Sequence, residues 1–394
     1  MLKNYFLLIT TVVIVTSCAT TSPLTSLTYE ELEIEASTLS NKLDINVVEM
    51  DPGLSGTDEA SRNLGIWPEL RRAESRKFAV KLSKSLNESN AFAAISVTTN
   101  ADYLTDIVVT GKIVKSNGED VHLAITAIDS TGKKLIDNKV YKHRSNEYFY
   151  QNIRNKGVDP FDTIYRAVAG DLISELKSRN LQEIELITDL RFAKQLNDEQ
   201  FYDSVDFTNG KYELGFVPAS NDPMFLRAQN VQLKDLAFRN EMQKHYIGFS
   251  DDMEESYRIW QEAALKASKS KREAEARAAT QALLGTIMMV AAASSASNNT
   301  DPYDVNYGAI AAATVGAGLL VSAVGSAQEA KIHESTINEI SLSFDGEIAP
   351  KVVEMEGLEV KLEGSIENQF SQWQTVLGNI YESESSQTNE FEIL

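Results

Sequence analysis

The chain has 394 residues, 43% of them hydrophobic, and a formal net charge of -20. A chain of this size and apolar content buries a core and holds two or three domains, which excludes an intrinsically disordered protein. The acidic balance disfavours nucleic acid and anionic lipid surfaces as partners, because both are bound through cationic side chains.

The first residues carry a secretory signal. Lys3 is followed by an apolar run from Tyr5 to Val15 and then by two small residues before Cys18. A charged start, a short apolar stretch and small residues before a cleavage point are typical of signal peptides. The run is shorter than the roughly 20 apolar residues that a bilayer-spanning helix needs. We therefore expect residues 1–17 to be removed.

The pattern around Cys18 resembles the lipobox of bacterial lipoproteins. Cys18 is the only cysteine, and Ala19 follows it. The resemblance implies that the Cys18 thiol is acylated, becomes the mature N-terminus and anchors the protein in the outer membrane, facing the periplasm. With no second thiol, the chain has no intramolecular disulfide, no thiolate metal site and no cysteine nucleophile. Residues 18–44 are polar and are predicted to form a tether.

Residues 45–180 are predicted to form one sheet domain. Their order is β-α-β-β-β-β-α, which indicates a sheet with helices packed on it in two or three layers, within an α+β chain. Asn117-Gly118 marks a hairpin between two of the strands. The expected strands are 45–48, 92–99, 106–115, 121–128 and 135–144, and the expected helices run from Pro68 to Leu86 and from Asp159 to about Ser178.

One strand of this domain carries a family resemblance. Residues 101–113 read ADYLTDIVVTGKI. This segment resembles a strand of the curli-secretion channel lipoproteins and of the penicillin-binding-protein activator lipoproteins, whose N-terminal domain is similar to that of the translocation protein TolB. The resemblance covers about residues 44–180 and implies a binding and assembly role without a catalytic residue. The matching positions are Asp106, Val108, Val109, Gly111 and Ile113.

Residues 181–260 are predicted to be a mixed connecting unit. It contains a helix over 191–201, a hairpin at Asn209-Gly210, and one or two helices between Phe225 and Tyr257. The aromatics Phe249, Tyr257 and Trp260 are expected in a core or an interface. The residues expected to face inward are Leu233, Leu236, Met242, Tyr246 and Phe249.

Residues 261–340 are predicted to form a helical hairpin with an apolar tip rich in Gly and Ala. No charged residue occurs in 278–300 or in 305–328. Small residues four apart allow close approach of helix backbones. Packing within one subunit, an oligomerisation seam and membrane insertion are all compatible with this pattern. The candidate contact residues are Gly308, Ala312, Gly316, Gly318, Ser322 and Gly325.

The C-terminal part is predicted to hold a strand pair and an amphipathic helix over 341–381. Ile340–Phe344 is expected to pair with Val352–Glu363, and the helix to run from Ser365 to Tyr381. Residues 382–394 are expected to form a flexible acidic tail.

No catalytic constellation is recognisable. The four histidines are far apart in sequence, and the pairs Asp251-Asp252 and Glu254-Glu255 are interpreted as solvated helix starts. The basic cluster 269–272 is interpreted as a solvated helix face or a headgroup contact. We expect no enzymatic activity, no metal and no cofactor.

These observations predict a non-enzymatic outer-membrane lipoprotein that scaffolds or assembles a cell-envelope complex. Its expected partners are membrane lipid through Cys18, further copies of itself through the Gly/Ala-rich hairpin, and an unidentified envelope protein, but not nucleic acid. Two alternatives are a component of an export pore and an activator of a periplasmic wall-synthesis enzyme.

Overall fold

The computed structural model describes residues 39–63, 66–152, 155, 157–270, 272–273, 351–355 and 358–391. Helices and strands are mixed along this chain, so the predicted α+β class is confirmed. A helix without a label covers 254–270. The labelled elements are β1 (Ile45–Val48), α3 (Asp58–Asn63), α4 (Pro68–Glu88), β2 (Ile95–Thr98), β3 (Ile107–Ser116), β4 (Asp120–Asp129), β5 (Lys134–Arg144), α5 (Glu147–Gln151), α6 (Asp162–Leu176), α7 (Leu181–Leu196), η2 (Tyr202–Ser204), β6 (Val205–Thr208), β7 (Lys211–Leu214), α8 (Pro223–Asp252), β8 (Lys351–Met355), β9 (Leu358–Leu362) and α12 (Ile366–Phe391).

The central sheet has the strand order β2-β1-β3-β4-β5. Strand β1 pairs in parallel with both β2 and β3, and Ile45 lies opposite Ile95 on one side and Ile107 on the other. The β3–β4 and β4–β5 pairs are antiparallel. The predicted strands and the turn at Asn117-Gly118 are confirmed. The short helices α3 and α5 were not predicted.

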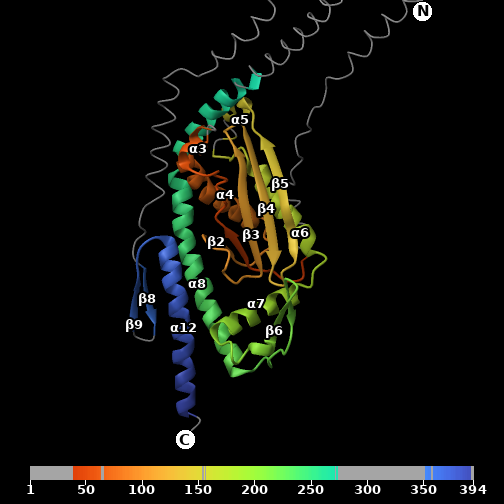
Figure 1. The fold of residues 1–394 in the computed structure, drawn as a ribbon, viewed down its shortest axis with the longest axis vertical. Helices are drawn as coiled ribbons and strands as arrows, with labels where there is room; N and C mark the ends of the chain where they lie inside the picture. The colour runs from red at the N-terminus through yellow and green to blue at the C-terminus, as the bar shows by residue number, and fades with distance from the viewer. Residues whose placement is uncertain are drawn as a thin grey trace, which may run out of the picture.

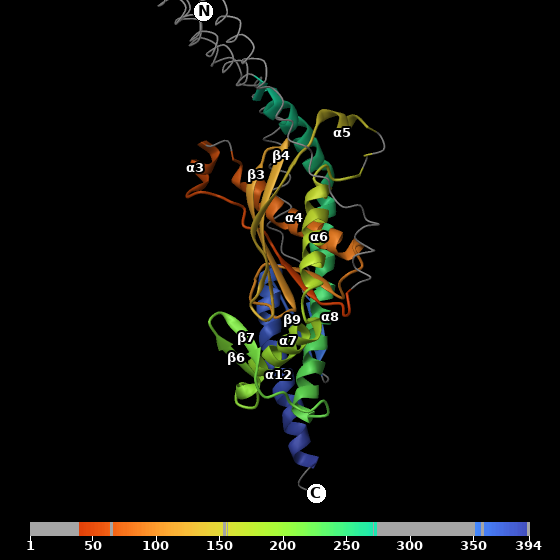
Figure 2. The same ribbon diagram turned by 90° about the vertical axis from the view of Figure 1, so that its right-hand side faces the viewer.

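Helices α4 and α6 cover one face of this sheet, so sheet and helices form two layers (Figures 1 and 2). Pro68 opens α4, where proline is tolerated because the first N–H of a helix has no intrahelical acceptor. Phe78, Leu82 and Leu86 recur at helical spacing on the buried side of α4 and are at most 1% exposed.

Three of the residues that carry the family resemblance, Val109, Gly111 and Ile113, pack the layer between sheet and helices, whereas Val108 lies on the other face of the sheet. Val109 and Ile113 of β3 are buried. A side chain at Gly111 would lie 3.0 Å from the Ile125 side chain and 3.0 Å from that of Met50. A larger residue at position 111 would displace these two side chains, so Val109, Gly111 and Ile113 have structural roles.

The two edges of the sheet are protected in different ways. The side-chain amide of Gln243 on α8 accepts a hydrogen bond from the Val97 N–H at 2.7 Å and donates one to the Val97 carbonyl at 3.0 Å. The glutamine thus replaces a neighbouring strand along β2. At the opposite edge, β5 carries exposed lysines and two register shifts, which discourage pairing with another strand.

Helix α7 differs from the prediction of a helix over 191–201. It begins ten residues earlier, where the Asn180 side chain accepts a hydrogen bond from the Glu183 N–H, and it ends at Leu196. The Asn180 cap outweighed the hydrophobic spacing that suggested a later start. The hairpin at Asn209-Gly210 is confirmed, with φ of 54° and 78° at its two turn residues.

Helix α8 and residues 254–270 follow one another along the body, and α12 packs beside α8 (Figure 1). The rings of Phe238 and Trp373 stack at 4.6 Å, and the Trp373 indole N–H donates to Asp235 at 3.1 Å. Tyr257 and Trp260 are buried as expected, but Leu233, predicted to face inward, is 63% exposed. The inner stripe of α8 instead includes Val231 and Phe238.

The segment Val352–Glu363, predicted as one strand, contains two strands, and its predicted pairing with Ile340–Phe344 stays a prediction. The β8–β9 hairpin forms within 351–362, so Val352–Glu363 pairs with itself. Residues 340–344 lie outside the described residues. Helix α12 continues to Phe391 instead of ending at Tyr381, so most of the predicted flexible tail is helical.

Candidate functional site

The site residues predicted from the sequence lie outside the described residues and remain predictions. This holds for the signal peptide, for Cys18, for most of the tether and for most of the predicted helical hairpin. It also holds for the six candidate contact residues, which are Gly308, Ala312, Gly316, Gly318, Ser322 and Gly325. The described residues nevertheless contain exposed surfaces with a clear chemical character.

The first surface is the sheet face opposite α4 and α6, called here the open face. It follows from strand alternation, since every second side chain of β3, β4 and β5 points to this side. The strand register places two complete rows across the three strands, Val108–Ile128–Lys134 and Lys112–Ala124–Val140. The open face consists of Val108, Thr110, Lys112, His122, Ala124, Thr126, Ile128, Lys134, Val140 and Lys142.

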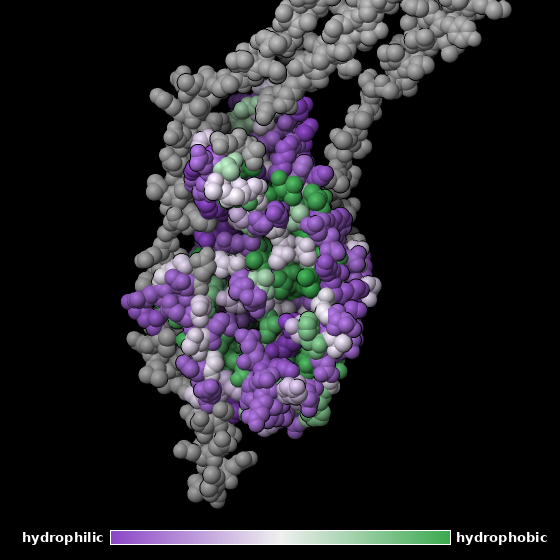
Figure 3. Space-filling model, in the orientation of Figure 1, coloured by the Kyte–Doolittle hydropathy of each residue, from purple (hydrophilic) through white to green (hydrophobic). Residues whose placement is uncertain are grey.

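The centre of the open face is apolar and in contact with solvent. Val140 is 42% exposed and Ile128 is 37% exposed. Figure 3 shows apolar side chains gathered over the middle of the sheet, with hydrophilic ones around them. Contiguous exposed apolar surface with a polar rim is typical of an interaction site.

Cations border this apolar centre. Lys115 and Arg144 both pair with Asp120, each at 2.7 Å, and Lys142 has no hydrogen-bond or ion-pair partner among the described residues. Burial, together with the positive charges of Lys115, Lys142 and Arg144, lowers the pKa of His122, although Asp120 acts in the opposite direction. The open face is therefore basic, although the chain as a whole is strongly acidic.

The second surface is the segment 198–217, called here the acidic knob. It contains η2, β6 and β7, and it carries five acidic residues against one lysine. Asp206 lies directly opposite Glu213 in the hairpin, an arrangement of like charges that is destabilising. Phe207 is 62% exposed and Phe216 is 70% exposed. The knob thus combines negative charge with exposed aromatic rings.

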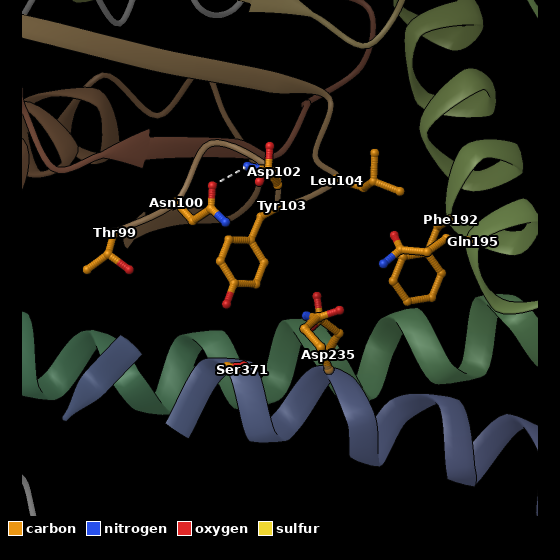
Figure 4. A pocket seen from close by; sticks show the side chains of 10 residues that line it. Thr99, Asn100, Asp102, Tyr103, Leu104, Phe192, Gln195, Asp235 and Ser371 are labelled. Atoms are coloured by element: carbon orange, nitrogen blue, oxygen red, sulfur yellow. Dashed lines mark hydrogen bonds between the residues drawn. The ribbon is translucent and has the colours of Figure 1, made fainter. Parts of the chain in front are cut away.

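The loop over 99–105 lines two pockets. One hollow of about 310 Å³ is lined by this loop, α7, α8 and α12 (Figure 4). Tyr103 points into it, and the Asn100 side-chain carbonyl accepts a hydrogen bond from the Asp102 N–H at 2.9 Å. A second hollow of about 330 Å³ shares Tyr103 and Leu104 and connects to the open face through Val108 and Ile128. The open face therefore continues into a partly apolar groove beside the knob.

Asp106 anchors the loop that leads into β1. Its carboxylate accepts a hydrogen bond from the Asp44 N–H at 2.8 Å. Burial raises the pKa of Asp106 to about 6, although hydrogen bonds from Thr188 and from Asp44 favour the charged form. The buried carboxylate is explained by this structural link and is not assigned a catalytic role.

Replacing Asp106 by Asn is expected to stabilise the protein at pH 7.5. The folded state binds a proton at Asp106 more readily than the unfolded state, whose ordinary pKa is 3.8, so this group favours folding increasingly as pH falls from about 6 towards 3.8. Removing it should raise the free energy of unfolding by about 2–3 kcal/mol at pH 7.5 and by much less at pH 4. Urea unfolding at both pH values measures this difference.

Asp102 is exposed, so Asp102→Asn is the matched control for this prediction. It should change the free energy of unfolding at neither pH 7.5 nor pH 4. A lower unfolding midpoint for Asp106→Asn at pH 7.5 would contradict the assignment, because it would mean that the charged carboxylate stabilises the fold.

Two interpretations of charged residues made from the sequence need correction. Glu254, expected to be solvated, pairs with Lys77 and, at 3.0 Å, with Lys81 on α4. In the basic cluster, Lys269 pairs with Glu147 at 2.7 Å, and Arg272 pairs with Glu119 at 2.7 Å. These charges attach residues 254–273 to the sheet domain, a role visible only once the helix is placed on the sheet.

Within the described ranges, no three acidic, histidine or cysteine side chains come together as a metal site. The described helices include none that is both long and apolar enough to cross a bilayer. Comparison of the chain with protein-family models, with curated proteins and with solved structures finds no match.

Neither the open face nor the acidic knob was predicted from the sequence. A signal was present in β5, where Val140, Lys142 and Arg144 alternate with residues of the opposite face. Its meaning depends on β3 and β4 lying beside β5 in register, which a single strand does not reveal.

Proposed function

We propose that this protein is a non-enzymatic lipoprotein of the outer membrane that scaffolds a cell-envelope complex. The acylated Cys18 holds it to the membrane, and the Gly/Ala-rich segment within 278–328 joins copies of it. The proposal also places it with the lipoproteins that it resembles over residues 44–180, which bind and assemble.

The observation that carries this proposal is the open face. An apolar surface bordered by cations lies uncovered beside an acidic knob with exposed aromatic rings, and both suit binding to another macromolecule. The buried Asp106 and Asp235 and the half-exposed Glu254 are explained by structural roles, because each joins one element to another.

The full chain expressed in a Gram-negative host is expected to incorporate labelled fatty acid and to fractionate with the outer membrane. Cys18→Ala should lose both the label and the membrane fraction, because the thiol is the acylation site. Mass spectrometry of a purified chain that keeps its leader and carries no acyl group would refute the anchor.

The detergent-extracted full chain is expected to have the native mass of an oligomer, and deletion of 278–328 should convert it to a monomer. Native mass spectrometry distinguishes the two. A monomeric full chain would overturn the scaffold proposal, whereas an oligomer that survives the deletion would place the seam elsewhere.

A further inference from the structure

The acidic knob and the open face are complementary in charge and in apolar character. The knob offers Asp206 and Glu213 on one side of its hairpin and the exposed Phe207 on the other, and the open face offers Lys112 and Lys142 near Val140. In the knob, Asp206 and Glu213 lie directly opposite each other, and this pairing of like charges is unfavourable without a partner of opposite sign. The acidic pair would lose this repulsion on contact with the lysines of the open face.

The knob is attached at the β4–β5 end of its own sheet. The Tyr212 N–H donates to the Thr131 carbonyl at 2.9 Å, and the Arg191 guanidinium stacks on the Tyr212 ring at 3.8 Å. A side chain at Gly132 would collide with the Gly210 carbonyl, so the two turns are in close contact. The knob is thus fixed to the end of the sheet and presents its outer residues to another molecule.

The open face is recessed between two projections. In Figure 2 the open face points to the left, and α3 and the β6–β7 hairpin both extend farther to the left than the strands of the sheet between them. A flat bilayer would meet these projections before it reached the sheet. A projecting element of protein, such as a hairpin with its side chains, fits this shape better.

We infer that the acidic knob of one copy docks on the open face of a second copy of this chain. The contact is heterologous, because two different surfaces meet, and successive contacts build a ring or a filament. This inference rests on the proposed function and deepens it, since it names the surfaces that orient neighbouring copies.

Exchange of charges tests the inference in the full, detergent-extracted chain. The face variant is Lys112→Glu with Lys142→Glu, and the knob variant is Asp206→Lys with Glu213→Lys. Lys112 pairs with the half-exposed Asp51, and Lys142 has no ion-pair partner among the described residues, so neither change leaves a buried charge unpaired. Each variant alone should raise the protein concentration at which half of the chains are assembled about a hundredfold, because like charges then face each other.

Combining both pairs of changes in one chain should restore assembly to within about threefold of the wild type. An equimolar mixture of the two single-surface variants should also assemble, since each supplies the surface that the other needs. Lys84→Glu with Lys244→Glu alters the net charge by the same amount on exposed helix positions and should leave assembly unchanged. Circular dichroism melting checks that every variant folds.

The outcomes separate the inference from the proposed function. Two results would overturn the knob-to-face contact while leaving the scaffold proposal standing. In the first, both charge-reversed variants assemble like the wild type. In the second, each variant loses assembly and the combined variant does not recover it. A monomeric wild-type chain would overturn both. Binding of the wild type, but not of the face variant, to anionic vesicles without any effect on assembly would assign the open face to lipid instead.

Discussion

Glu254→Gln is expected to lower the free energy of unfolding by about 2–3 kcal/mol. Its partner Lys77 is 1% exposed on α4, so the substitution leaves a buried ammonium with an amide in place of a carboxylate. Breaking a fully buried pair costs about 3–5 kcal/mol, and the loss here is smaller because the Glu254 side chain is 37% exposed.

The same pair has a defined pH dependence. Burial lowers the pKa of Lys77 from its ordinary value of 10.5, and the Glu254 carboxylate opposes this. Without the carboxylate, protonation of Lys77 disfavours the folded state below its lowered pKa. The loss of unfolding free energy caused by Glu254→Gln should therefore become smaller as pH rises towards 10.5, because the neutral amine needs no partner.

Urea unfolding between pH 7 and pH 10 measures both effects. The neighbouring Glu255→Gln is the matched control, because Glu255 is exposed and pairs only with Arg258 in the same helix, so its loss should change stability by less than about 0.5 kcal/mol. Adding Lys77→Met to Glu254→Gln should recover most of the loss. Equal losses of stability in Glu254→Gln and Glu255→Gln would contradict a specific contribution of the Lys77–Glu254 pair to stability.

Gly118→Ala is expected to destabilise the protein by about 2–5 kcal/mol, from backbone strain and overpacking together. Gly118 has φ of +80°, and a Cβ there would lie 2.6 Å from the Ala264 Cβ and 2.8 Å from the Gln261 carbonyl. The β3–β4 turn therefore sits directly against residues 254–270. Ser268 donates to the Asn117 carbonyl at 2.8 Å at the same contact.

Gly210→Ala provides the matched control for this prediction. Gly210 also occupies a hairpin turn, with φ of +78°, but nothing lies within 4 Å of its added Cβ. Its substitution should cost only the backbone strain, about 1–2 kcal/mol. The difference between the two variants in urea unfolding measures the packing of the helix on the turn.

Amide hydrogen exchange locates the effect. Gly118→Ala should accelerate exchange across residues 254–270, because the added methyl group separates this helix from the turn. Unchanged protection there, together with equal destabilisation by both alanines, would mean that the helix does not depend on this contact.

Most of the helices and strands, but neither of the two surfaces, could be predicted from the sequence. Alternation and turn residues identified β1 to β5, and Pro68 with its following apolar spacing identified α4, because these signals are local. The alternation in Val352–Glu363 did not reveal that this segment forms two strands, β8 and β9, which pair with each other, since alternation does not specify which strand is the partner. The start of α7 was missed because the Asn180 cap is set by one hydrogen bond and not by periodicity.

The roles of the charged residues depend on long-range packing and could not be predicted from the sequence. Glu254 and Lys77 are 177 positions apart and meet because residues 254–270 pack against α4. Lys112 and Lys142 face the same side because the strand register aligns β3, β4 and β5. A charge has the same chemistry everywhere in a sequence, but its partners and its solvent exposure are fixed by long-range packing, and these set whether it stabilises the fold or remains available for binding.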